Sequence, residues 1–181
     1  MKQFAQSLAV AIIGAIIAIL LTYIIIDNIE SRNIKELDAT RAELHGFWIF
    51  RIRINESDLE QYKEIELFNF ASLTIDKNFE VNGVSYKWRE INKTSQFIYP
   101  RERRTVSDIR GSIIGRDLIL NARSRNEENL ESITVFDGSI ISEGLIQGNL
   151  LSDVAFSIGT FCAKRIETTD VFNENISCEL P

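Results

Sequence analysis

An uninterrupted apolar run near the N-terminus most restricts how this chain folds. Residues Leu8 to Ile26 read LAVAIIGAIIAILLTYIII and contain no acidic or basic side chain. As a helix with a rise of about 1.5 Å per residue, the run spans roughly 29 Å, which matches the hydrocarbon thickness of a bilayer. We therefore predict a single transmembrane helix in residues 1–26, with a water-soluble domain after it.

A cleaved secretory signal is the leading alternative for this run. Such signals have a shorter apolar core followed by small residues, whereas this run continues into Tyr23 and three isoleucines. Only Lys2 precedes the run, while Arg32, Lys35 and Arg41 follow it. The positive-inside rule then predicts a single-pass protein of the inner membrane whose soluble domain lies in the cytoplasm.

Small residues recur on one face of the predicted membrane helix, at spacings of three and four. Small side chains let two helices approach closely in lipid, so the pattern predicts a homo-oligomer in the bilayer. The alternative is that Ala and Gly are common in any membrane helix. The predicted oligomerisation face consists of Ser7, Ala11, Gly14, Ala15, Ala18 and Thr22.

Residues 27–45 are expected to continue the helix as a stalk. The segment contains no Pro or Gly and is rich in helix formers. Ile34, Leu37, Arg41 and Leu44 form a thin stripe, typical of a short coiled coil or of a face packed on a domain. The helix should end at His45-Gly46, which gives the only histidine a structural role.

From Phe47 onward the apolar residues recur with a period of two, which predicts β-strands. In the first predicted strand, Trp48, Phe50, Ile52 and Ile54 share one face. We predict a mostly β fold in which residues 46–167 form an antiparallel barrel of about eight strands, with a sandwich as the alternative. Residues 168–181 form a C-terminal tail. Turns are predicted at Asn82-Gly83, at Gly115, at residues 125–129, at Asp137-Gly138 and at Gly148-Asn149.

Two short motifs at the ends of the predicted barrel resemble the lipocalin-like (calycin) barrels. Gly46-Phe-Trp48 opens the first strand, and Lys164-Arg165 closes the last. In those barrels a G-x-W on strand one meets a basic residue on the final strand. The resemblance implies that Gly46, Trp48 and Arg165 (or Lys164) close the barrel end, with the cation lying on the indole ring. The T-D-Y motif of the lipocalins is not evident.

The plan of a membrane helix followed by a strand-rich barrel also resembles the transmembrane β-barrel effectors of bacterial CBASS antiphage defence. This resemblance concerns architecture alone. It implies a bacterial, membrane-anchored effector whose barrel senses a small anionic ligand, such as a cyclic nucleotide, and whose helices oligomerise to disrupt the membrane. Two alternatives stay open, namely a structural or assembly subunit of a membrane complex and an anchored carrier of an apolar molecule.

The sequence contains none of the common catalytic motifs, so no catalytic residue, cofactor or metal site is predicted and the protein is expected not to be an enzyme. The net charge of −6 argues against a nucleic-acid polymer as partner. Aromatic rings stack on bases and guanidinium groups bind phosphates, whereas the alternative is a set of core aromatics and a solvated arginine loop. The candidate ligand-binding residues are Tyr86, Trp88, Tyr99, Arg101, Arg103 and Arg104.

The chain has two cysteines, Cys162 in the predicted last strand and Cys178 in the tail. Most lone cysteines in strands are small buried hydrophobic residues. For a domain in the cytoplasm we expect free thiols, whereas a domain outside the cytoplasm would allow a disulfide that holds the tail.

Overall fold

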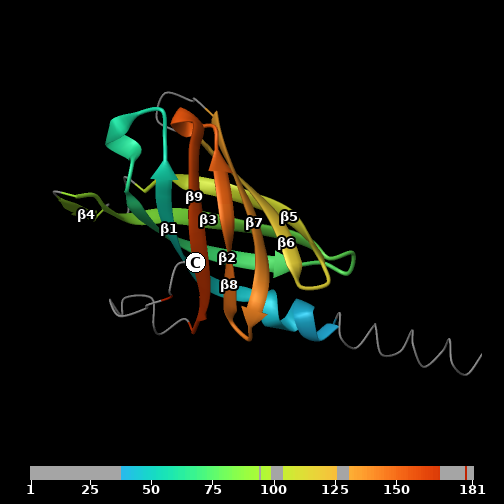
Figure 1. Cartoon of the computed structure of the whole chain (residues 1–181). Helices are drawn as coiled ribbons and strands as arrows, with labels where there is room; N and C mark the ends of the chain where they lie inside the picture. Colours follow the sequence, from blue (N-terminus) through green and yellow to red (C-terminus); the bar gives the residue numbers. More distant parts are fainter. Residues whose placement is uncertain (1–37, 94, 99–103, 126–130, 168–177, 179–181) are drawn as a thin grey trace, which may run out of the picture. The chain divides into compact units, whose positions relative to one another are not determined.

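The computed structural model describes residues 38–93, 95–98, 104–125, 131–167 and 178, and Figure 1 traces the other residues in grey. The strands all belong to one compact unit, Thr40–Pro181. The predicted membrane span, its small-residue face and residues 27–37 of the predicted stalk lie outside the described residues. None of the described helices is long and apolar enough to cross a membrane.

Eight antiparallel strands form a closed barrel, and this calycin-like architecture confirms the barrel alternative over the sandwich (Figure 1). Each barrel strand pairs with the next one along the chain, and the last pairs back with the first. A ninth strand, β4 (Gln96–Ile98), pairs only with β3 and lies outside the ring. The barrel strands are β1 (Gly46–Glu56), β2 (Glu66–Ile75), β3 (Glu80–Ile91), β5 (Val106–Ile114), β6 (Asp117–Arg125), β7 (Glu131–Ser142), β8 (Leu145–Ser152) and β9 (Ser157–Ile166).

The period-two pattern of β1 decides which side chains enter the barrel. The four apolar residues of the predicted inner face, from Trp48 to Ile54, are buried in one core cluster. Arg51 and Arg53 alternate with them and lie on the outer face, where both contact Glu66. Burial of apolar side chains therefore fixes the register of this strand.

One end of the barrel is packed with large side chains. Trp48 and Leu44 are both almost fully buried there. Residues 38–44 are helical, and the helix ends at His45 as predicted. The indole Nε1 of Trp48 donates a hydrogen bond of 2.9 Å to the carbonyl oxygen of Leu44, and Arg41 Nε donates one of 3.2 Å to the carbonyl oxygen of Ile75. We call this end, where β1 begins and β9 finishes, the closed end.

The hairpin turn predicted at Asn82-Gly83 is wrong, because β3 runs straight through both residues. The chain reverses earlier, where the Asp76 carboxylate accepts hydrogen bonds from the backbone N–H groups of Asn78 and Glu80. Gly83 serves a different purpose. A β-carbon there would lie 2.3 Å from the carbonyl oxygen of Ser72, so the close approach of β2 requires glycine.

The turns predicted at Asp137-Gly138 and Gly148-Asn149 are also wrong. Strand β7 continues through Gly138 and strand β8 through Gly148. A β-carbon on Gly138 would lie 2.7 Å from the ring of Phe161, so this glycine makes room for an aromatic side chain inside the barrel. The turn at Gly115 between β5 and β6 is confirmed, and the one predicted at residues 125–129 falls largely on residues that are not described.

Candidate ligand-binding site

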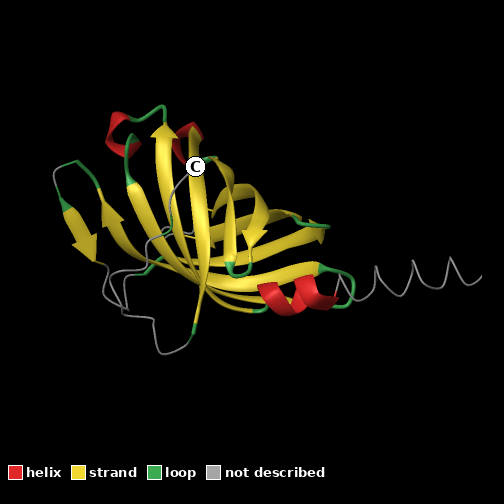
Figure 2. Ribbon diagram, turned by 60° about the horizontal axis from the view of Figure 1, so that its bottom comes forward, coloured by secondary structure: helices red, strands yellow, loops and turns green. Residues whose placement is uncertain are grey.

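The barrel lumen is hollow at the end opposite Trp48, which we call the open end. A cavity of about 240 Å³ lies there, and all eight barrel strands or their adjoining residues contribute to its wall. It is bounded by strand ends that meet at the same rim, where β1, β3, β6 and β8 finish and β2, β5, β7 and β9 begin. The structure thus combines one packed end with one hollow end. Figure 2 shows the barrel strands in yellow from a second direction.

Hydroxyl groups line a large part of this cavity. Two pairs bridge neighbouring strands, with 2.6 Å between the oxygens of Ser124 and Ser132 and 2.9 Å between those of Thr134 and Ser152. Each residue continues the inward-facing stripe of its own strand, which is apolar nearer the closed end. The hydroxyl-bearing lining residues are Tyr62, Thr105, Ser107, Ser124, Ser132, Thr134, Ser152 and Ser157.

A charged and amide-bearing wall is formed by β2 and β3. Lys87 Nζ donates a hydrogen bond of 3.2 Å to Glu90 Oε2, and both side chains are about one-quarter exposed. Asn69 is the direct cross-strand partner of Lys87. Its Oδ1 atom is buried and accepts no hydrogen bond from the residues that the structure describes. The described part of this wall therefore contains an ion pair and a buried acceptor without a partner among the described residues.

Two loops at the rim are tied together beside the cavity. The backbone N–H of Asp58 and the Ser57 hydroxyl both donate to the carbonyl oxygen of Ala155, at 2.9 and 3.0 Å. Ala155 and Phe156 both have positive φ angles, of 52° and 43°, and the Phe156 side chain is 72% exposed. The entrance thus carries an exposed aromatic ring on a strained backbone.

The candidate residues predicted from the sequence lie elsewhere or are not described. Tyr86 is exposed, and neither it nor Trp88 is among the residues that line the cavity. Trp88 packs edge-on against Phe68, and the Arg89 guanidinium lies 4.0 Å from the centre of the Phe68 ring. Arg104 is described and has a partner, and it does not line the cavity either. Tyr99, Arg101 and Arg103 fall outside the described residues.

The three predicted barrel-closure residues come together at the closed end. Trp48 on β1 and Arg165 on β9 are direct cross-strand partners. A β-carbon on Gly46 would lie 3.3 Å from Arg165 Nε, and Arg165 also donates a hydrogen bond of 3.2 Å to the carbonyl oxygen of Glu43. The proximity of these residues agrees with the lipocalin-like motif, while the cation–π contact between Arg165 and Trp48 stays a prediction.

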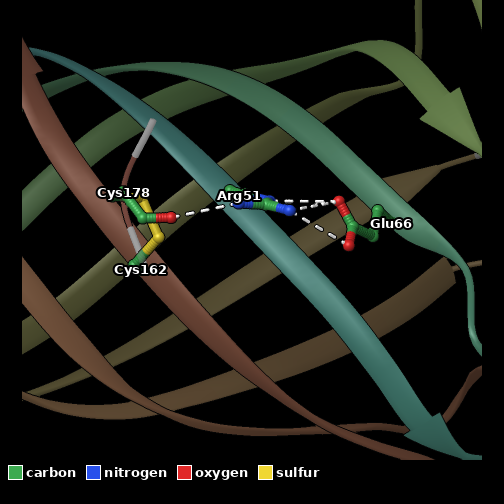
Figure 3. Close-up of a disulfide and its surroundings, with 4 residues drawn as sticks. All are labelled: Arg51, Glu66, Cys162 and Cys178. Carbon is green, nitrogen blue, oxygen red and sulfur yellow. Dashed lines mark hydrogen bonds and ion pairs between the residues drawn. A yellow bond between two sulfur atoms is a disulfide. The ribbon is translucent and has the colours of Figure 1, made fainter. Parts of the chain in front are cut away.

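The two cysteines form a disulfide, so the expectation of free thiols is wrong. Cys162 lies on the outer face of β9, and Cys178 comes from the tail; both are buried. Arg51, the cross-strand partner of Cys162, donates to the Cys178 carbonyl oxygen at 3.2 Å and to the Glu66 carboxylate at 2.9 to 3.1 Å (Figure 3). The disulfide requires Cys178 to lie against the barrel wall beside Cys162. No local sequence signal indicates this position.

The same group of side chains perturbs Glu66. Burial raises the pKa of this carboxyl group, but hydrogen bonds from Arg53 and Arg51 lower it more. The net result is a pKa below the ordinary value for glutamate. Glu66 therefore stays ionised and holds Arg51 against the tail at neutral pH.

The comparisons with known proteins assign no family. Neither the models of known protein families nor the sequences of curated proteins match this chain. Functional conclusions therefore rest on the geometry of the barrel.

Proposed function

We propose that the barrel is a non-catalytic receptor that holds one small polar molecule in the open end of its lumen. The observation that supports this is the cavity of about 240 Å³ beside a closed end packed with Trp48 and Leu44. Barrels of eight strands have an interior that side chains fill or that holds one small ligand. Toward the open end, serine and threonine hydroxyls join the apolar residues of the lining, such as Ile54 and Ile65.

The hydroxyl and amide groups of the lining argue against the predicted alternative of a carrier for an apolar molecule, although apolar residues such as Ile52, Leu67 and Phe136 also line the cavity. An apolar ligand would cover the serine and threonine hydroxyls of the lining without offering them hydrogen bonds. Each polar group buried in this way costs about 1–3 kcal/mol. A polar ligand avoids this cost.

A role as a membrane-anchored antiphage sensor stays a prediction, and the cavity favours a smaller ligand than the one it implies. Pockets for drug-sized molecules have volumes of about 300–1,000 Å³, whereas this cavity measures about 240 Å³. A cyclic oligonucleotide also carries phosphate charges, and the Lys87–Glu90 pair offers no net positive charge. Membrane disruption by a homo-oligomer depends on residues that are not described.

We also propose that the barrel lies outside the cytoplasm. Disulfides persist in oxidising compartments and are rare in the cytosol, and here a disulfide holds the tail to the barrel. The basic residues after the predicted membrane helix favour the opposite orientation, but only by a margin of two or three side chains. The disulfide is the stronger argument.

Thermal unfolding with and without small molecules tests the receptor function. The full-length protein in detergent micelles is screened against a library of polar metabolite-sized compounds, alongside a Ser107→Phe variant whose new ring fills the cavity. Ser112→Phe is the control, because Ser112 lies on the same strand but is exposed on the outer face. A ligand at 100 times its Kd stabilises by about 2.7 kcal/mol.

The expected result is at least one compound that raises the unfolding midpoint of the wild type and of Ser112→Phe but not that of Ser107→Phe. A library without any such compound, or shifts that are equal in all three proteins, would contradict the receptor function.

A further inference from the structure

The charges in the cavity restrict the charge of its ligand. Lys87 and Glu90 are the charged residues among the described residues that line the cavity, and they form an ion pair with each other. An ion that enters a partly dehydrated site loses hydration, and an opposite fixed charge compensates this loss most effectively. Because the charges of Lys87 and Glu90 are opposite, the described part of the wall favours a ligand without net charge.

The unsatisfied acceptor restricts the polar groups of the ligand. Asn69 Oδ1 is buried and without a hydrogen-bond partner among the described residues. Buried acceptors of this kind are rare and usually have a functional explanation. Asn69 lines the cavity, so a rotation of its side chain that turned this buried oxygen toward the lumen would let a ligand O–H or N–H group supply the missing bond.

A second polar wall faces this one. Strands β7 and β8 lie four places round the ring from β2 and β3, so they form the opposite side of the barrel. Ser132, Thr134 and Ser152 on these strands line the cavity with hydroxyl groups, each of which can donate and accept. A ligand between the walls therefore meets hydrogen-bonding groups on two sides.

The volume restricts the size of the ligand. A cavity of about 240 Å³ corresponds to about eight water molecules, each with a share of about 30 Å³ in the liquid. We propose that the open end of the lumen binds an uncharged, polyhydroxylated molecule about the size of a monosaccharide. This inference rests on the proposed receptor function and goes beyond it by naming the ligand class.

Two pairs of probes test the ligand class on the full-length protein in detergent micelles. Glucose is compared with glucuronate, which differs by one negative charge. myo-Inositol is compared with cyclohexanol, which keeps the six-membered ring but has one hydroxyl group. Dissociation constants are measured by ligand-observed NMR at millimolar probe concentrations. We expect at least one of the two neutral polyols to bind at least about tenfold more tightly than its partner.

Variants show whether the binding occurs at the proposed wall. Asn69→Leu removes the unsatisfied acceptor and should weaken polyol binding about tenfold, which corresponds to about 1.4 kcal/mol. Asn149→Leu makes the same change at an exposed position of β8 and should leave binding unchanged. Ser107→Phe should abolish binding, and Ser112→Phe should not.

The outcomes separate this inference from the receptor function. If glucuronate or cyclohexanol binds as tightly as its partner and Ser107→Phe removes that binding, the lumen is a receptor site but the ligand class is wrong. If polyol binding is unaffected by Asn69→Leu, or if neither polyol binds, the inference is overturned. The receptor function itself fails only if the wider library also yields no compound sensitive to Ser107→Phe.

Discussion

Asn69 and Lys87 are cross-strand partners beside a β-bulge, where the register between β2 and β3 shifts after Phe68. The bulge leaves Trp88 as an extra residue on β3. Residues three apart on a regular strand face opposite sides, yet Lys87 and Glu90 both line the lumen because of this extra residue. The bulge therefore assembles the charged wall of the cavity, as bulges near binding sites commonly do.

Asn69→Leu should leave the free protein as stable as the wild type or more stable by about 1 kcal/mol. Its buried Oδ1 lacks a partner, so the substitution removes a desolvation cost rather than a hydrogen bond. Chemical denaturation of the ligand-free full-length protein measures this. A loss of more than about 1 kcal/mol, without a matching loss in Asn149→Leu, would mean that Asn69 is a structural residue.

Trp48→Ala should destabilise the barrel by about 3–5 kcal/mol, the range for truncating a large buried aromatic residue. Trp48 is fully buried and donates its indole N–H to Leu44, so both packing and a hydrogen bond are lost. Trp88→Ala is the matched control on the outer face and should cost clearly less. Equal losses in urea unfolding would argue against Trp48 as the residue that closes the barrel.

Cys178→Ser should lower the free energy of unfolding by about 3 kcal/mol, as expected for a cross-link that closes a loop of about 15 residues. The sequence separation of the two cysteines is 16. In cells, acid quenching followed by a thiol-reactive polyethylene glycol should label neither cysteine of the full-length protein before reduction. Complete labelling of both without a reductant would place the barrel in a reducing compartment.

Glu66→Gln should change how the free energy of unfolding depends on pH in the acidic range. The pKa of Glu66 in the folded protein is below its ordinary value of about 4.3. The ionised carboxylate therefore stabilises the folded state fully above about pH 4.3, and this stabilisation is lost as the pH falls through the pKa of the folded protein. The variant should be less stable than the wild type at pH 7, and the difference should shrink below about pH 4. The same change at exposed Glu80 is the control, and a difference independent of pH would contradict the assignment.

Ala155→Gly should stabilise the protein by about 0.5–1 kcal/mol, because Ala155 adopts a left-handed conformation with φ of 52° and ψ of 34°. Ala163→Gly, at a fully buried position in the middle of β9, should instead destabilise it. Thermal unfolding of the two variants distinguishes these effects. A loss of stability in Ala155→Gly would mean that the loop is not strained.

The barrel itself was predictable because burial imposes a regular pattern on each strand. The alternation in β1 and the G-x-W at Gly46 to Trp48 are local signals, and the structure places both as expected. Three of the predicted turns were wrong, and the reason is physical. Asn82-Gly83 has the composition of a hairpin, but whether a glycine makes a turn or admits a neighbouring strand depends on atoms distant in sequence.

The cavity was not predicted from the sequence, because serine and threonine are common residues and those that line the cavity have no distinctive spacing. A signal did exist: in β6 the inward stripe runs from Leu118 and Leu120 through Ala122 to Ser124, and β8 ends its stripe at Ser152. Hydroxyls at the same end of several antiparallel strands indicate a polar lumen, but only once the strand order is known. Tyr86 was a candidate ligand-binding residue because of its aromatic ring, although its place in the alternation of β3 puts it on the outer face.

The most direct test of the lumen as a ligand site is an NMR titration of the ¹⁵N-labelled full-length protein in micelles with myo-inositol and, in parallel, with glucose. We expect at least one of them to shift the side-chain amide signal of Asn69 and the backbone signals of Ser132 and Ser152. Signals of Asn149 and Ser112 on the outer face should stay in place. Shifts confined to the outer face, or no shifts with either polyol or with any compound of the library, would contradict a ligand site in the lumen.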